Sequence, residues 1–89
     1  MRDCTIDEAR MARIYRRIGQ NVRRAREERG VSQLALALEM GHKAVGSVSL
    51  PELGVQGKHF NIEHLVKIAQ ILEVDISLFF EGIWDERAR

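Results

Sequence analysis

The most constraining segment of this chain spans residues 32–48, where two short helical patterns lie on either side of a glycine. Ser32 can accept hydrogen bonds from the free amides of a first helical turn, and apolar residues then recur at helical spacing. Gly41 ends this pattern at the position where glycine adopts a left-handed backbone at least cost. Val45 and Val48, three residues apart, anchor a second short helix after the turn. Because two helices of this length cannot bury their apolar faces alone, the rest of the chain must form a bundle around them.

A longer helical pattern precedes this segment. Thr5 and Glu8 have the spacing of a capping box and predict a helix over about residues 6–29. We expect this helix to break or bend near Gly19 and to stop at Gly30. Its second half supplies the first helix of the bundle, and its first half is an N-terminal helical extension.

The remaining patterns complete an all-α fold. Pro51 closes the third helix because proline cannot continue it, and the glycines that follow predict a loop. The predicted bundle has five helices, of which the second to fifth cover about residues 32–40, 42–50, 61–72 and 75–84, with Asn61 and either Asp75 or Ser77 as caps. We therefore divide the chain into an extension over residues 1–17 and a bundle over residues 18–89.

Charge is unevenly distributed along the chain. The formal net charge is only +1, but residues 1–30 hold nine arginines against five acidic residues, whereas residues 61–89 hold three basic residues against six acidic ones. A local basic patch favours phosphate binding more than the net charge does. A short exposed helix held at an angle on a bundle also fits the major groove of DNA. These two features point to double-stranded DNA as the partner.

Other classes of function find little support in the sequence. The single cysteine, Cys4, excludes an internal disulfide and a cysteine-rich zinc site. The three histidines do not have the spacing of metal ligands, and the chain has no nucleophile motif or glycine-rich phosphate loop. We therefore expect no enzyme activity, no cofactor and no metal. Since there is neither a membrane-length apolar run nor a signal-peptide pattern, we expect a soluble cytoplasmic protein.

Two stretches of the chain resemble one known family. Residues 18–33 are similar to the opening of the Cro/phage-repressor (Xre-type) helix-turn-helix proteins, and residues 60–80 are similar to their fourth helix and the start of their fifth. Within that family, the restriction-modification controller proteins are the most similar in size and in their Phe-Phe-containing last helix. The resemblance implies a repressor-like helix-turn-helix bundle. It also implies a sequence-specific regulator of transcription that binds a palindromic operator as a homodimer and acts by repression.

The family usually has an apolar–small–x–apolar–Glu pattern in its third helix, and its placement here leaves two registers open. The preferred register uses residues 45–48, which buries two valines and leaves Ser49 where the Glu is expected. A gapless register would bury Ser47 and Leu50 instead. In the preferred register, Arg26 of the first helix lacks the Glu with which the family usually pairs it.

The resemblance and the preferred register together identify residues expected to contact DNA. Gln33 matches a phosphate-contacting Gln of the family, and arginines of the first helix are expected to add phosphate contacts. Outward side chains at the head of the third helix could reach base edges, where Lys43 could bond to guanine. Residues in the loop before the fourth helix match the place where the family touches the DNA backbone. The predicted DNA-binding residues are Gln33, His42, Lys43, Ala44, Ser47, Lys58 and His59.

The fifth predicted helix has more large apolar side chains than one face of a small bundle can bury. We predict that it forms the homodimer interface through Leu78, Phe79, Phe80, Ile83 and Trp84. The same surplus also supports an alternative. The chain could be an antitoxin or another protein-interaction module, with a protein as its main partner and DNA binding as a secondary property.

Overall fold

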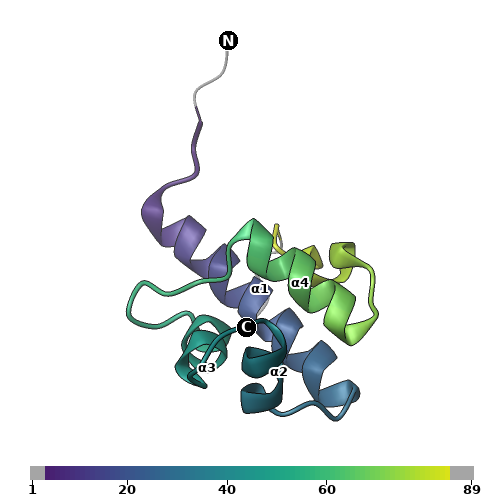
Figure 1. Ribbon diagram of the computed structural model, residues 1–89. Helices are drawn as coiled ribbons and strands as arrows, with labels where there is room; N and C mark the ends of the chain where they lie inside the picture. Colours follow the sequence, from purple (N-terminus) through teal and green to yellow (C-terminus); the bar gives the residue numbers. More distant parts are fainter. Residues whose placement is uncertain (1–3, 85–89) are drawn as a thin grey trace.

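The computed structural model describes residues 4–84, which form a bundle of helices (Figure 1). Their buried apolar side chains form one core. The expected all-α class is confirmed, since the described residues form helices and no β-strand. The predicted count of five helices is wrong, because the last segment is only a five-residue 3-10 turn. The elements are α1 (Glu8–Glu28), α2 (Gln33–Glu39), α3 (Gly46–Leu53), α4 (Ile62–Leu72) and the 3-10 turn η1 (Ile76–Phe80).

The first helix begins slightly later than predicted and is not broken. Asp7, rather than Thr5, caps α1, because a side-chain oxygen of Asp7 accepts the backbone N–H of Arg10 at 2.8 Å. The helix then runs through the predicted boundary after residue 17 without interruption. Ile14, which lies within the predicted extension, is buried in the core. The extension and the bundle are thus joined by one continuous helix.

Gly19 permits a close approach between two helices and does not interrupt α1. A Cβ atom at this position would lie 2.5 Å from the carbonyl oxygen of Pro51 and 2.6 Å from that of Glu52. Both oxygens belong to the backbone of α3. Only a residue without a side chain allows α1 and α3 to pack this closely. The glycine that suggested a bend therefore marks the contact that sets the position of α3.

The predicted caps of the second helix are confirmed. The side-chain oxygen of Ser32 accepts the backbone N–H of Ala35 at 3.0 Å. Gly41 has a φ of +89°, and the following residue, His42, donates its backbone N–H to the carbonyl oxygen of Ala37 at 2.9 Å. In α2, the side chains of Leu36 and Ala37 are buried in the core, whereas those of Leu34 and Leu38 are exposed.

The third helix lies further along the chain than predicted. α3 begins at Gly46 and continues through Pro51 to Leu53, whereas the prediction began it at residue 42 and used the proline as its end. Proline lacks the amide hydrogen and so leaves the carbonyl oxygen of Ser47 without its helical donor. Tertiary contacts compensate for this loss, because Pro51 is buried against α1 and Glu52 pairs with an arginine of α1.

Both registers proposed for the third helix are wrong. Val48 is fully buried, as the preferred register requires, but Val45 is exposed. Ser47 and Leu50, the core residues of the gapless register, are only half-buried. The family pattern falls instead on residues 48–52, where a valine opens it and a glutamate closes it. The buried proline fills the second apolar position of that pattern.

The fourth helix has the predicted cap. The side-chain oxygen of Asn61 accepts the backbone N–H of His64 at 2.8 Å, and the backbone N–H of Asn61 donates to Nδ1 of His64 at 3.2 Å. These reciprocal bonds form a capping box. Two large apolar residues of α4, Ile62 and Val66, are exposed. The buried residues of α4 are Leu65, Ile68, Ala69 and Leu72.

The C-terminal turn packs against α1. Asn21 of α1 donates from Nδ2 to the carbonyl oxygens of Phe79 and Glu81, at 2.9 Å each. The side chain of Phe79 is fully buried and belongs to the core. Asp75 caps η1 by accepting the backbone N–H of Ser77 at 2.9 Å. None of the described helices is long and apolar enough to cross a membrane.

Candidate nucleic-acid interface

A buried ion pair joins α1 to α3. Nε of Arg26 donates to Oε2 of Glu52 at 2.7 Å, and Nη2 donates to Oε1 at 3.1 Å. The two side chains are only 8% and 1% exposed. Nη1 of Arg26 also donates to the carbonyl oxygen of Val31, just before α2, at 2.9 Å. The expectation that this ion pair is lacking is therefore wrong, because its acid is Glu52 and not residue 49.

Gln33 lies next to this ion pair. Its Nε2 donates to Oε1 of Glu52 at 2.9 Å, and its side chain is half-buried. A side-chain amide has two donor hydrogens, so Glu52 fixes one of them and the other remains for a ligand. One carboxylate thus orients side chains from α1 and α2 as well as its own helix.

An open groove of about 480 Å³ lies over the ion pair, between α1, the start of α2 and α3. We call it the α1–α2–α3 groove. At its edge, Nε of Arg23 donates to Glu27 at 3.1 Å, and the guanidinium has further N–H donors. Such donors suit phosphate oxygens, which receive most protein–DNA hydrogen bonds. The groove is lined by Arg23, Arg26, Ser32, Gln33, Ser49, Glu52 and Leu53.

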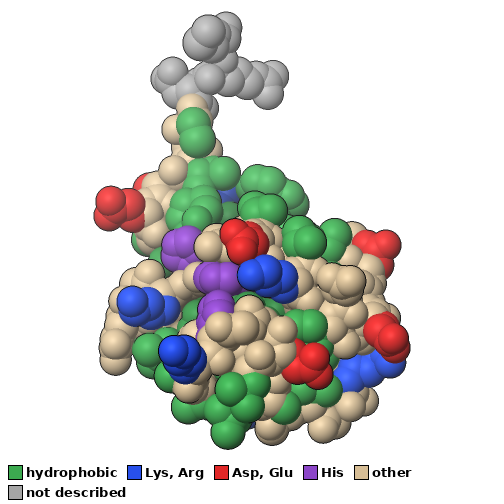
Figure 2. Space-filling view, in the orientation of Figure 1, with side chains coloured by type: hydrophobic (Ala, Val, Ile, Leu, Met, Phe, Trp, Pro, Cys, Tyr) green, Lys and Arg blue, Asp and Glu red, His purple; other side chains and the backbone are tan. Residues whose placement is uncertain are grey.

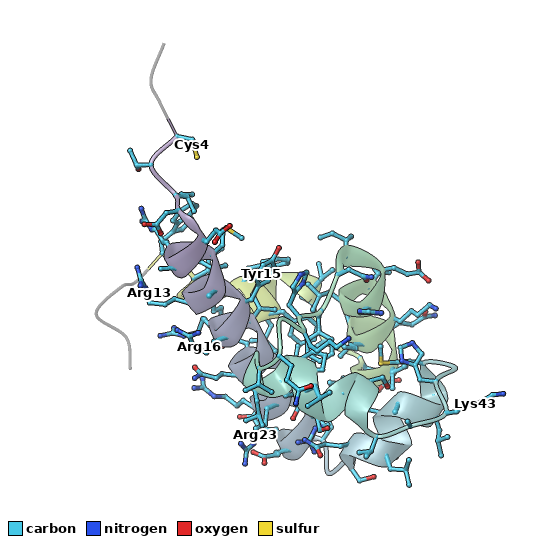
Figure 3. All side chains as sticks on the ribbon, turned by 90° about the vertical axis from the view of Figure 1, so that its left-hand side faces the viewer. Cys4, Arg13, Tyr15, Arg16, Arg23 and Lys43 are labelled. Atoms are coloured by element: carbon cyan, nitrogen blue, oxygen red, sulfur yellow. The ribbon has the colours of Figure 1, made fainter. Side chains whose placement is uncertain are left out.

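Three residues predicted at the head of the third helix lie instead in the turn before it. His42, Lys43 and Ala44 precede the first residue of α3, so their placement in a helix is wrong. Figure 3 shows the exposed side chain of Lys43 projecting from the molecule. Ser47 does lie in the first turn of α3, where its hydroxyl donates to the carbonyl oxygen of Ala44 at 2.9 Å. All four residues therefore lie at the N-terminal end of α3.

Lys58 and His59 lie in the loop between α3 and α4, as expected, but they do not line the groove that holds Gln33. They border a second groove of about 390 Å³ against the first half of α1. The imidazole of His59 stacks on the ring of Tyr15, with centroids 3.7 Å apart and planes 10° apart. This stacking ties the loop to α1.

Histidines from three segments gather on one face, beside Lys or Arg side chains (Figure 2). The rings of His42 and His64 meet edge to face, with centroids 5.5 Å apart. Burial lowers the pKa of the His64 imidazole, and the nearby His42, Lys67 and His59 lower it further, against an opposing effect of Glu63.

Within residues 4–84, no three His, Cys, Asp or Glu side chains are arranged to hold a metal ion.

Sequence reasoning missed Arg23, Ser49, Glu52 and Leu53 as individual members of the site. Figure 3 shows Arg23 on the same side of α1 as Arg16. Their separation of seven residues, two helical turns, was a signal that the sequence contained. A second signal was Glu52, which follows Val48 by four residues and closes the family pattern. Local rules hide this signal, because they end the third helix at Pro51.

The residues predicted for the dimer interface have different environments. Phe79 is in the core and cannot contact a partner, so this part of the prediction is wrong. Leu78, Phe80 and Ile83 are half-buried. Trp84 is 64% exposed, and the guanidinium of Arg10 lies over its ring, 5.6 Å from the centroid.

A family model described as helix-turn-helix matches residues 22–79, from the second half of α1 to η1. Comparison with curated proteins found no match. All residues that line the α1–α2–α3 groove fall within the matched range.

Proposed function

The chain belongs to the helix-turn-helix family of the Cro/C1 type, and from this premise we propose that it binds a palindromic operator as a homodimer and represses transcription. Membership of this family indicates a DNA-binding regulator of transcription. The repressor role, the dimer and the symmetry of the operator are our own inferences. Repression follows most simply if the operator overlaps a promoter, because a bound dimer then excludes the polymerase.

The observation that carries this proposal is the α1–α2–α3 groove. It presents Arg23 and the free hydrogen of Gln33 beside the outward face of α3. Phosphate contacts at this groove would fix the register of the protein on the duplex, and α3 would enter the major groove. Lys43 at the N-terminal end of α3 would reach a phosphate or a base edge, and Lys58 in the following loop would add a backbone contact.

We place the dimer contact at the C-terminal end of the described chain. Trp84 and Ile83 lie beyond η1, and the indole is exposed on the surface. Aromatic side chains are common anchors of interfaces. The change Trp84→Ala with Ile83→Ala should therefore shift the protein towards monomer in sedimentation analysis, with its helix content retained. An unchanged dimer would place the interface elsewhere.

The test of DNA binding is the salt dependence of affinity, measured by gel shift with the full chain. A dimer that contacts six to ten phosphates should lose roughly 10³–10⁵ in affinity between 50 and 200 mM salt. Arg23→Ala should weaken binding to every sequence and flatten this dependence by about one ion per protomer. Lys58→Ala should act in the same direction.

Arg24→Ala is the matched control, because Arg24 is also exposed on α1 but does not line the groove. It should leave the salt dependence closer to that of the unaltered protein than Arg23→Ala does. Equal effects of Arg23→Ala and Arg24→Ala on the salt dependence would show that DNA does not bind at the groove. An affinity for DNA that does not respond to salt would refute the phosphate contacts proposed at this groove. The absence of any binding to DNA at low salt would favour the protein-interaction alternative.

A further inference from the structure

The outward face of α3 is almost devoid of side chains that hydrogen-bond to bases. The helix has the sequence Gly-Ser-Val-Ser-Leu-Pro-Glu-Leu, without Arg, Lys, Asn or Gln. Its one charged side chain, Glu52, is buried in the ion pair with Arg26. Direct recognition of bases usually relies on bidentate bonds from the four side-chain types that α3 lacks. If α3 recognises a sequence, it must therefore do so mainly by other contacts.

The apolar residues of α3 that do not belong to the core lie along one side of the helix. Val48 and Pro51 point inward and are buried. Gly46, Leu50 and Leu53 have the spacing i, i+4, i+7, which places them along one opposite side of the helix. We call these three residues the α3 stripe. Leu53 is 54% exposed and Leu50 is half-buried.

Gly46 keeps this stripe open. A Cβ atom at Gly46 would lie 3.8 Å from Cδ1 of Leu50, in ordinary contact with it. Since glycine has no side chain, residue 46 places no side-chain atom over this methyl group of Leu50. A base edge could approach both the helix backbone and this methyl group.

The two serine hydroxyls of α3 add little hydrogen bonding to bases. The hydroxyl of Ser47 already donates to the carbonyl oxygen of Ala44. Ser49 faces the α1–α2–α3 groove, together with Leu53, Gln33 and Arg23. The stripe thus adjoins side chains suited to phosphate. The spare N–H donors of Arg23 and Gln33 are complementary to the phosphates that flank a major groove, which favours DNA as the occupant of this face.

We propose that the α3 stripe selects DNA sequence through the C5-methyl groups of thymine. Thymine is the only base that presents a methyl group in the major groove, and apolar side chains recognise it by contact. Leu50 lies at the centre of the stripe and makes the main contact, and Leu53 makes a second one next to the phosphates. This inference rests on the proposed DNA binding and specifies how that binding discriminates between sequences.

The test compares thymine with uracil, which differs only by the methyl group and keeps every hydrogen-bonding group of the base. The full chain first selects its preferred sites from a random duplex library. Each thymine of the selected site is then replaced by uracil, one at a time. Replacement at a contacted position should weaken binding about fourfold, the effect expected for one buried methyl group.

A variant then assigns the effect to the stripe. Leu50→Ala should largely lose the preference for thymine over uracil at the position that Leu50 contacts, while its helix content is unchanged and the preference at the position contacted by Leu53 remains. Val66→Ala is the matched control, because Val66 is an exposed apolar residue on α4. It should keep the preference for thymine. The comparison of duplexes on the unaltered protein does not depend on whether either variant folds.

The possible outcomes separate this inference from the proposed function. Specific binding that is indifferent to every uracil replacement would overturn the inference and leave DNA binding intact. Salt-dependent binding without any selected sequence would also overturn it. Thymine dependence that survives undiminished at every position in Leu50→Ala would move recognition away from Leu50 and overturn the inference. A protein that binds no duplex even at low salt would refute the proposed function itself.

Discussion

Replacement of Glu52 by Gln tests the central contact of the fold. Glu52→Gln keeps the size of the side chain but removes its charge, so the guanidinium of Arg26 stays buried without a counter-ion. The amide also turns a donor group towards Arg26 or Gln33 in place of an acceptor oxygen. The three hydrogen bonds that the carboxylate accepts, at 2.7, 2.9 and 3.1 Å, cannot all survive this change.

The size of the effect follows from the burial of the pair. With side chains 8% and 1% exposed, loss of one partner should cost about 3–5 kcal/mol of the free energy of unfolding. A chain of this length has roughly 4–13 kcal/mol in total. The change therefore removes a large share of the stability and should lower the melting temperature by more than about 12 °C.

Urea unfolding followed by far-ultraviolet circular dichroism measures this loss. Glu27→Gln is the matched control, because Glu27 forms an exposed ion pair with Arg23 and should leave the urea midpoint nearly unchanged. The double change Arg26→Met with Glu52→Met should be less destabilising than Glu52→Gln alone, since no unpaired charge stays buried. A loss below about 1 kcal/mol for Glu52→Gln would show that the pair behaves like a surface salt bridge and refute this reasoning.

Three further results are expected. Gly19→Ala should destabilise the protein by about 1–3 kcal/mol in thermal melts despite the better helix propensity of alanine, because its Cβ would overlap the carbonyl oxygen of Pro51; a stabilised variant would contradict the close approach. Because the folded state lowers the pKa of His64, stability should fall as the pH drops below the ordinary histidine value of about 6.5, and urea midpoints across pH 5–8 should show a weaker fall in His64→Gln, which keeps a capping acceptor. Phe79→Ala should cost about 3–5 kcal/mol in urea unfolding, whereas Trp84→Ala should leave the unfolding of the monomer nearly unchanged; similar losses would mean that the indole also belongs to the core.

The sequence predicted well those parts of the fold that depend on neighbouring residues. The caps Ser32 and Asn61 accept the backbone N–H groups three residues further along the chain. Gly41 adopts the positive φ that a side chain would disfavour. Such local rules require no knowledge of the tertiary fold. They placed α2 and α4 correctly and located Gln33 at the start of α2.

The position of α3 could not be predicted by local rules. The local effect of Pro51 is to end a helix, and it is outweighed only by its burial against α1 and by the pairing of its neighbour Glu52. Both compensations come from residues more than twenty positions away in the chain. The error in α3 then spread to the site, because it placed Lys43 inside a helix and missed Ser49 as a residue that lines the groove.

The convergence of three helices on the carboxylate of Glu52 has a consequence for how such a chain can diversify. Because α1, α2 and α3 are fastened to one another at this buried point, α3 cannot tilt to suit a different binding partner without breaking several bonds at once. The outward residues of α3 take no part in the hydrogen bonds to Glu52. Substitution of the exposed Leu53 should therefore change stability little, so variants of this chain could differ in the contacts they make at this face while keeping the same scaffold.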